Sequence, residues 1–302
     1  MTPVVVLGPT ASGKSTLGLV AARTLGAVEL VSADALQLYR GMDIGTAKPT
    51  AAERAAVPHH AVDLFEPWQD ATVVDWRAAY RCALHAIGEQ GSRALVVAGT
   101  GLYCRFAVDG FEPPAEYPEL RAELEGDPDT IGLHGRLATL DPLAAARMEP
   151  TNRRRVVRAL EVTLGAGRPF SSFGPGLEVY PPTDIVQIGL RWPREVLARR
   201  IEERFHGMLD AGLLAEVDHL LRDPRGLSRT AAQALGYKEL AEHLWGRCTL
   251  DEAVELAIRR TRQFAVRQIR WFRRDPRIRW VDLHDDPLEA LPAVLEALCP
   301  SP

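Results

Sequence analysis

Residues 3–15 read PVVVLGPTASGKS, a short apolar run followed directly by the pattern G-x-x-x-x-G-K-S. The apolar run predicts a buried parallel strand, and residues 17–24 predict a helix that is closed by Gly26. A strand before the loop and a helix after it form the context in which a P-loop binds phosphate. Glycines let several backbone N–H groups converge, and the helix N-terminus adds partial positive charge at the same point. We therefore expect a di- or triphosphate at this loop.

Each residue of the loop is a candidate ligand for that phosphate. Lys14 supplies a mobile cation for phosphate oxygens, and Ser15 supplies a hydroxyl for Mg²⁺. Ser15 is thus the predicted metal ligand, and Mg²⁺ is the predicted cofactor. The complete predicted phosphate-binding set is Gly8, Pro9, Thr10, Ala11, Ser12, Gly13, Lys14 and Ser15.

The chain has 302 residues, 46% of them hydrophobic, and a formal net charge of −4. This composition predicts a globular protein with a large core and an appended unit. The four cysteines stand apart without a C-x-x-C pair, which argues against a structural zinc site and favours a reducing compartment. No apolar run reaches membrane-spanning length, and no secretory segment opens the chain. We therefore expect a cytoplasmic protein without membrane contact.

A carboxylate follows the second predicted strand, which covers residues 28–32. In a doubly wound sheet, ligands bind at the carboxyl ends of the strands, so Asp34 should face the same site as the P-loop. Spacing alone leaves three roles open for Asp34, namely helix N-cap, Mg²⁺ ligand and general base.

Further strands are predicted at residues 94–98 and 184–190, and a helix with an apolar stripe is predicted at residues 72–88. Together these elements predict an α/β fold, a P-loop parallel sheet flanked by helices. The strand at 94–98 ends in Gly99 and Thr100, where a nucleoside triphosphatase would keep its Walker B aspartate, and a guanine-reading N-K-x-D is absent. Both observations weigh against nucleoside triphosphate hydrolysis.

Composition shifts at residues 110–114, and short helical patterns without strands follow as far as residue 164. We expect a core domain of residues 1–110 and 182–302, with a small all-helical insert at residues 111–181. The last helix of the insert carries four arginines within two turns, and such a density of like charge is destabilising unless an anion offsets it. A solvated surface and a phosphodiester site explain them equally well. The arginines are Arg153, Arg154, Arg155 and Arg158.

The C-terminal part is predicted to be mainly helical. Residues 195–221 have helical periodicity, and the last long helix opens with a capping box between Thr249 and Glu252. One face of that helix is apolar and should dock on the core, while a basic stripe faces outward near two tryptophans. This combination suits single-stranded nucleic acid. The stripe consists of Arg260, Arg267, Arg270 and Arg274, and the tryptophans are Trp271 and Trp280.

Taken together, these stretches resemble the tRNA dimethylallyltransferase family, from the P-loop to Trp280. The series of motifs in this order is highly specific, although Ala35 stands where a serine is usual and Arg154 where glutamine is frequent. The matching motifs are GPTASGKS (8–15), ADALQLY (33–39), GMDIGTAKP (41–49), GTGLY (99–103), DPLAAARMEP (141–150), RALEV (158–162), RFHGML (204–209), ALGYKE (234–239) and TRQFAVRQIRWFR (261–273).

The resemblance implies that the loop holds the diphosphate of dimethylallyl diphosphate, a leaving group. The acceptor is then the exocyclic N6 amine of the adenosine 3′ to the anticodon of tRNA, and Asp34 takes its proton. The catalytic residues that it implies are Asp34, Thr10, Lys14 and Arg204. The tRNA contacts that it implies are Asp34, Ala35, Leu36, Gln37, Thr100, Arg154, Arg155 and Arg158. The insert would grip the anticodon loop so that the target base leaves its stack, and we expect a monomer.

Two other classes of protein remain open on the residues alone. A P-loop small-molecule or nucleoside kinase would use Asp34 to accept a hydroxyl proton and the arginines as a phosphate lid. A non-catalytic RNA-binding protein would retain the loop as a vestige, but the complete G-K-S and the aspartate at the same sheet edge argue against it.

Overall fold

The computed structural model describes residues 2–174 and 176–299 of the chain. By its internal contacts the chain divides into two compact units, which are described separately. The first unit combines Met1–Asp109 with Pro182–Pro302, and the second is Gly110–Pro181.

The first unit is built on a parallel sheet with the strand order β3-β2-β4-β1-β5-β6. Helices flank this sheet, so the predicted α/β class is confirmed. Because the sheet is covered on both faces, every residue of β1 and β2 is buried, including the polar Glu29 and Ser32 of β2. The strands are β1 (Val4–Leu7), β2 (Val28–Ala33), β3 (His59–His60), β4 (Arg93–Ala98), β5 (Gln187–Arg191) and β6 (Ile278–Asp282).

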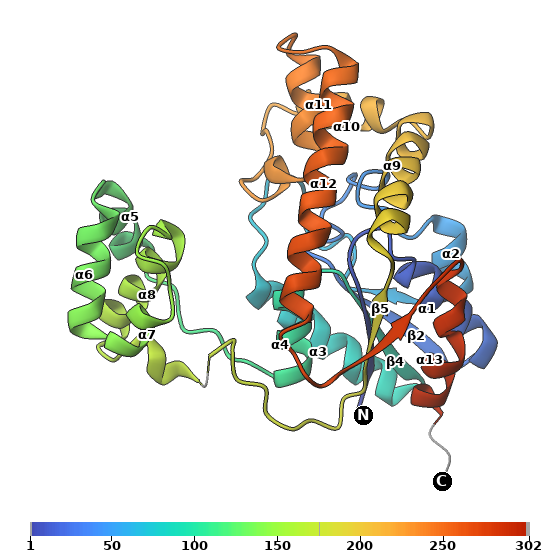
Figure 1. Ribbon diagram of the computed structural model, residues 1–302, viewed down its shortest axis with the longest axis horizontal. Helices are drawn as coiled ribbons and strands as arrows, with labels where there is room; N and C mark the ends of the chain where they lie inside the picture. The colour runs from blue at the N-terminus through green and yellow to red at the C-terminus, as the bar shows by residue number, and fades with distance from the viewer. Residues whose placement is uncertain (1, 175, 300–302) are drawn as a thin grey trace. The chain divides into compact units, whose positions relative to one another are not determined.

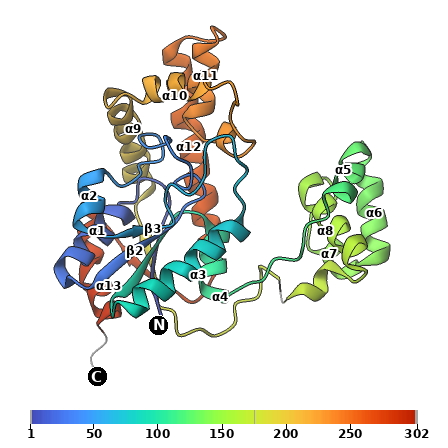
Figure 2. The same ribbon diagram turned by 180° about the vertical axis from the view of Figure 1, so that it is seen from behind.

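Helices α1 and α13 cover one face of the sheet, and α3 and α4 cover the other (Figures 1 and 2). The long helix α12 lies beside α9 and contacts α4. Within residues 2–174 and 176–299, no helix has the length and hydropathy of a membrane-crossing segment. The helices of this unit are α1 (Lys14–Leu25), α2 (Ala51–Ala56), α3 (Val73–Glu89), α4 (Gly101–Asp109), α9 (Arg194–Asp210), α10 (Leu213–Leu221), α11 (Tyr237–Leu244), α12 (Leu250–Phe272) and α13 (Leu291–Leu298).

Local signals account for several helix ends. The backbone of Gly26 is left-handed (φ 75°) and its N–H caps α1, as the sequence predicts. The capping box that was predicted for α12 is also present, since the Thr249 side chain accepts from the Glu252 N–H and the Glu252 carboxylate accepts from the Thr249 N–H.

The C-terminal part adds three details that the sequence patterns did not specify. Residues 195–221 are helical as predicted, and they form two helices because the backbone turns at Gly212 with φ 101°, which favours glycine. The edge strand β6 was not predicted, since a five-residue run containing Arg279 carries little periodicity. Arg260 of the basic stripe is 41% exposed, and its guanidinium also lies 2.6 Å from the buried carboxylate of Glu239.

The register of the sheet determines where the loops emerge. Leu7 of β1 and Ala33 of β2 both pair with Ala98 of β4. The chain therefore leaves all three strands at the same level, and the segments that begin at Gly8, Asp34 and Gly99 meet at one edge of the sheet.

The second unit is a small helical assembly with its own hydrophobic core. The inner faces of its helices contribute fully buried residues such as Leu137, Val156 and Leu160. The close approach of the Tyr117 ring explains Gly165, where an added Cβ would lie 2.3 Å from the ring. Its helices are α5 (Pro118–Gly126), α6 (Thr130–Leu140), α7 (Pro142–Ala146) and α8 (Arg153–Ala166).

Candidate active site

The loop of residues 8–15 connects β1 to α1 in a conformation that requires its glycines. Gly13 has φ 84°, and a Cβ at this position would also lie 2.4 Å from the Pro287 Cβ. Gly8 has no room for a side chain either, because a Cβ would lie 2.8 Å from the buried Ser12 Oγ. The tight curl brings the chain directly into the first turn of α1 at Lys14.

The first turn of α1 presents free backbone donors. No side chain caps this helix, and within the described part of the chain the N–H groups of Gly13, Lys14, Ser15 and Thr16 donate to no acceptor. Free N–H groups at the positive end of a helix are suited to binding an anion. The N–H groups of Thr10 and Ser12 are not part of it, since they donate to Gln268 and Pro9.

Two side chains from the second half of the unit hold the loop in place. The Trp192 indole N–H donates to the Ser12 carbonyl at 2.9 Å, and the Arg200 Nε donates to the Ala11 carbonyl at 3.0 Å. The Arg200 guanidinium in turn stacks 4.5 Å from the centroid of the Trp192 ring. These contacts tie the loop to the segment that joins β5 and α9 and to α9 itself.

Asp34 and Lys14 lie together against the backbone of Gly99. A Cβ on Gly99 would be 3.2 Å from the Asp34 Oδ2 and 3.2 Å from the Lys14 Cε. The other carboxylate oxygen, Asp34 Oδ1, accepts from the Leu36 N–H at 2.9 Å. No helix begins at residue 34, so the N-cap alternative is wrong and a catalytic or metal role remains.

Electrostatics tie Arg204 to this pair. Burial lowers the pKa of Lys14 to about 8, Asp34 partly offsets that shift, and Arg204 adds to it. Burial also lowers the pKa of Arg204, against the attraction of Asp34. Arg204 forms no ion pair with any described residue. The result is a site with two partly buried cations and one carboxylate, which favours a bound anion.

The other residues predicted near the acceptor hold loops together. The Thr100 hydroxyl accepts from the Ala35 N–H at 3.3 Å. The Gln37 amide accepts from the Ser32 hydroxyl at 2.7 Å, and it donates to two carbonyls of residues 46 and 47. Ala35, Leu36, Gln37 and Thr100 are all partly exposed at the same sheet edge as Asp34.

A cleft of about 1020 Å³ opens beside the start of α1. One wall is α1 with the ends of β2 and β4, a second is α9, and the third is formed by residues 43–51. Part of the lining is apolar and is suited to a short hydrocarbon group next to the free N–H groups of α1. The apolar lining includes Leu19, Leu30, Ile44, Ala47, Val97 and Met208.

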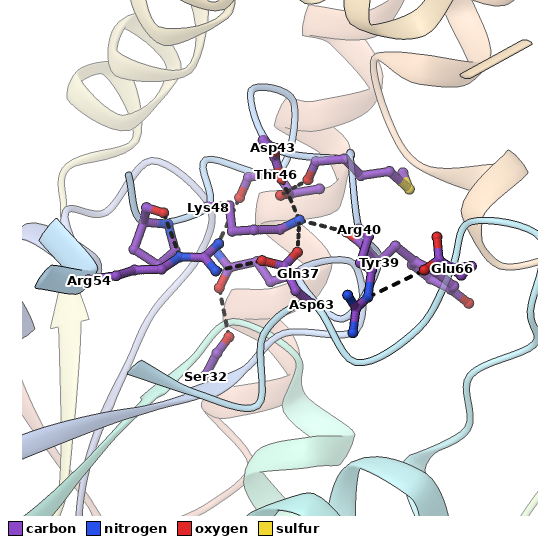
Figure 3. A network of polar contacts seen from close by, with 12 residues as sticks. Ser32, Gln37, Tyr39, Arg40, Asp43, Thr46, Lys48, Arg54, Asp63 and Glu66 are labelled. Carbon is purple, nitrogen blue, oxygen red and sulfur yellow. Dashed lines mark hydrogen bonds and ion pairs between the residues drawn. The ribbon is translucent and has the colours of Figure 1, made fainter. Parts of the chain in front are cut away.

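The third wall is held by a buried lysine (Figure 3). The Lys48 Nζ donates to the Tyr39 carbonyl at 2.6 Å, to Asp43 at 2.5 Å and to Asp63 at 2.7 Å. Arg54 donates to the second oxygen of Asp63. Burial would raise the pKa of Asp63, but the hydrogen bonds from Lys48 and Arg54 outweigh it and lower that pKa. Lys48 is therefore a structural cation, and none of its three donor positions remains for a ligand.

A second anchor of this wall is Glu216 of α10. Its carboxylate accepts the consecutive N–H groups of Asp43, Ile44 and Gly45 at 2.8–3.2 Å, and the Tyr237 hydroxyl donates to it as well. The Tyr237 ring occupies the space that a Gly45 side chain would need. The GMDIGTAKP and ALGYKE motifs are thus in contact, which their separation in sequence did not indicate.

The arginines of α8 fall into two groups. Arg153 donates to carbonyl groups at the end of α5, and Arg158 donates to Glu161 at 2.7 Å and to the Pro114 carbonyl at 2.8 Å. Arg154 and Arg155 are exposed in the first turn of α8 and form no ion pair with a described residue. A pair of free cations at a helix N-terminus suits a phosphate ligand.

Sequence reasoning assigned no role to Trp192, Glu216 or Gln268. Gln268 lies within the TRQFAVRQIRWFR motif, so the motif marked the position, but nothing local indicated its partners. Each of the three side chains holds a loop that is more than 170 residues away in the sequence.

Comparison with known proteins shows relatives over nearly the whole chain. The family model described as IPP transferase matches residues 37–275. The tRNA dimethylallyltransferase of Kineococcus radiotolerans is 48% identical, over 98% of this chain and 96% of that protein. That of Streptomyces coelicolor is 47% identical, over 92% of this chain and 89% of the other.

Solved structures share the fold. The crystal structure of the full-length tRNA isopentenylpyrophosphate transferase from Bacillus halodurans is similar with a TM-score of 0.70 and 35% identity, covering 98% of this chain and 96% of that one. A structure of a eukaryotic dimethylallyltransferase acting on tRNA has a TM-score of 0.80 at 24% identity, over 94% of this chain and 74% of the other.

Proposed function

The chain belongs to the IPP transferase family, and from this premise we propose that it is the enzyme that transfers a dimethylallyl group from dimethylallyl diphosphate to tRNA. The acceptor is the N6 amine of the adenosine 3′ to the anticodon. The observation that carries the proposal is the convergence of Lys14, Asp34 and Arg204 beside four free N–H groups and a partly apolar cleft.

The chemistry follows from the charges at this sheet edge. The N6 amine is a weak nucleophile, since its lone pair is delocalised into the purine ring. As N6 bonds to C1 of the dimethylallyl group, the C1–O bond breaks and its electron pair leaves with the diphosphate. The N6 proton passes to the carboxylate of Asp34, which acts as general base.

The leaving group gains negative charge during this step. We assign the binding of that charge to Lys14, Arg204, the Thr10 hydroxyl and the N–H groups of residues 13–16, which have no acceptor among the described residues. Donors aimed at the charge that develops on the diphosphate lower the barrier to transfer. The apolar part of the cleft holds the prenyl chain and excludes water from it.

Most ligands of a Mg²⁺ ion at this site would come from the diphosphate and few from the protein. Within the described residues, no group of three or more His, Cys, Asp or Glu side chains could bind a metal. The exposed Ser15 hydroxyl would be one protein ligand, and diphosphate oxygens and water would supply the rest. When bound, Mg²⁺ would neutralise charge on the diphosphate.

We assign tRNA binding to the helical unit and to the sheet edge around Asp34. The exposed Arg154 and Arg155 are suited to phosphodiesters, while Ala35, Leu36 and Thr100 are suited to surround an unstacked base. The kinase alternative is not favoured, because eight relatives at 43–48% identity are named tRNA dimethylallyltransferase.

The direct test offers the enzyme labelled dimethylallyl diphosphate or ATP, each with and without tRNA. We expect label in tRNA from dimethylallyl diphosphate alone, at an adenosine next to the anticodon. ATP turnover with a small acceptor and no RNA would instead establish a kinase.

The role of the α8 arginines is tested by the double variant Arg154→Ala/Arg155→Ala. We expect weaker tRNA binding, with a salt dependence of log affinity that is flatter by about 0.7 per lost phosphate contact. The control Arg23→Ala/Arg81→Ala also removes two exposed charges, from α1 and α3, and should leave the slope unchanged. Equal slopes in both double variants would mean that Arg154 and Arg155 are only solvated.

The lowered pKa of Lys14 predicts a pH dependence. Lys14 is charged below its pKa of about 8 and loses its charge above it. The kcat/KM for dimethylallyl diphosphate should therefore fall by about tenfold per pH unit above this value. Bound diphosphate raises the pKa of Lys14, so kcat should respond less. In Lys14→Arg the decline should move to higher pH, and a decline that stays in place would exclude Lys14 as its cause.

A further inference from the structure

Gln268 of α12 is a buried polar side chain that joins two loops of the site. It is 7% exposed, and both ends of its amide are hydrogen-bonded to backbone. The Gln268 Oε1 accepts from the Thr10 N–H at 2.9 Å, and the Gln268 Nε2 donates to the Gly99 carbonyl at 2.7 Å.

The two backbone partners belong to opposite halves of the reaction. Thr10 lies in the loop that faces the leaving diphosphate. Gly99 lies against Asp34 and Lys14, and it is followed by Thr100, which accepts from the Ala35 N–H. One glutamine thus spans the distance from the leaving-group loop to the segment beside the general base.

A second contact of α12 reinforces this attachment. Trp271, one turn beyond Gln268, packs so closely on Gly101 that an added Cβ would lie 2.2 Å from the Trp271 Cδ1. The segment of residues 99–101 therefore packs on α12, and Gln268 links this segment to Thr10 by hydrogen bonds.

We propose that Gln268 is a positioning residue that sets the spacing between the bound diphosphate and the acceptor amine. The inference rests on the proposed function. Its chemical basis is that the Thr10 N–H needs an acceptor and the Gly99 carbonyl needs a donor. A side-chain amide provides both at a fixed separation. An apolar side chain would leave the part-buried Thr10 N–H and the buried Gly99 carbonyl without these partners, so both loops would shift. A displacement of about 1 Å between reacting groups can cost about 10²-fold in rate.

The experiment compares Gln268→Met and Gln268→Ala with Gln263→Ala, an exposed glutamine on the same helix. Single-turnover rates at saturating substrates are measured together with tRNA and dimethylallyl diphosphate affinities. We expect rates that are about 10- to 100-fold lower in both Gln268 variants, with affinities within about twofold of wild type. The Gln263 variant should match wild type. A Gln268→Met rate equal to wild type, or a loss that appears only as weaker binding, would overturn the proposal.

Gln268→Glu gives a readout that a purely structural role would not produce. The charged carboxylate can accept from Thr10 but repels the Gly99 carbonyl, whereas the protonated acid again offers one acceptor and one donor. Because burial raises a carboxyl pKa, the ratio of variant to wild-type rate should rise as the pH falls from about 8 to about 6. A ratio that does not change with pH would contradict the proposal. A wild-type enzyme that transfers no prenyl group would instead refute the proposed function, before any variant is compared.

Discussion

Asp34→Asn is expected to lower kcat by about 10²- to 10⁴-fold, the usual range for the loss of a general base. Asparagine keeps the shape of the side chain, and its Oδ1 can still accept from the Leu36 N–H. It cannot take the N6 proton. The KM values for tRNA and dimethylallyl diphosphate should change little, because the ground-state contacts survive. Steady-state and single-turnover kinetics measure both effects.

A Mg²⁺ titration of the same variant separates the two roles that remain for Asp34. If the carboxylate were a metal ligand, the variant would need more Mg²⁺ and would recover much of its rate at high concentration. If Asp34 is instead the general base, the rate of the Asp34→Asn variant should stay low at every Mg²⁺ concentration. Recovery with metal would therefore exclude the assigned role.

Lys14→Ala is expected to lower prenyl transfer by about 10³-fold, because a cation aimed at the developing charge of the diphosphate is lost. Lys14 is partly buried and interacts electrostatically with Asp34 and Arg204, and charges interact more strongly in such a site than in water. The fall should appear in kcat as well as in the affinity for dimethylallyl diphosphate, while tRNA affinity stays close to that of wild type.

Lys14→Met provides the matched control, since it keeps most of the side-chain volume without the charge. We expect it to be as impaired as Lys14→Ala. If Lys14→Met were nearly as active as wild type at saturating dimethylallyl diphosphate, Lys14 would serve packing, and the loop would need another source of positive charge.

Local patterns were sufficient to predict the α/β class and the main elements of the sheet. The run at residues 3–7 is short, apolar and rich in valine, and Gly26 closes the helix that follows it, so each signal lies within a few residues of its effect. The position of Asp34 at the same edge also followed from sequence order, because consecutive parallel strands end at one edge.

The α8 arginines show the limit of such patterns. Four arginines of one helix are equivalent in the sequence, yet Arg153 and Arg158 are bound to groups of the same unit while Arg154 and Arg155 are exposed. The carbonyl partners of Arg153 and Arg158 lie 26 to 44 residues earlier in the chain. The spacing of the arginines along α8 therefore could not predict those contacts.

The sequence by itself determined the strand, loop and helix of residues 3–26 and the carboxylate at their edge, because neighbouring residues decide backbone conformation and strand order. Only the tertiary structure decided what holds these parts in place. The Ser12 carbonyl accepts a hydrogen bond from the Trp192 indole, 180 residues further along the chain. The Thr10 N–H donates to the Gln268 amide oxygen, 258 residues further along. Hydrogen bonds of this kind depend on how α9 and α12 pack against the sheet. The register of that packing follows from the whole core, so no local spacing could have predicted it.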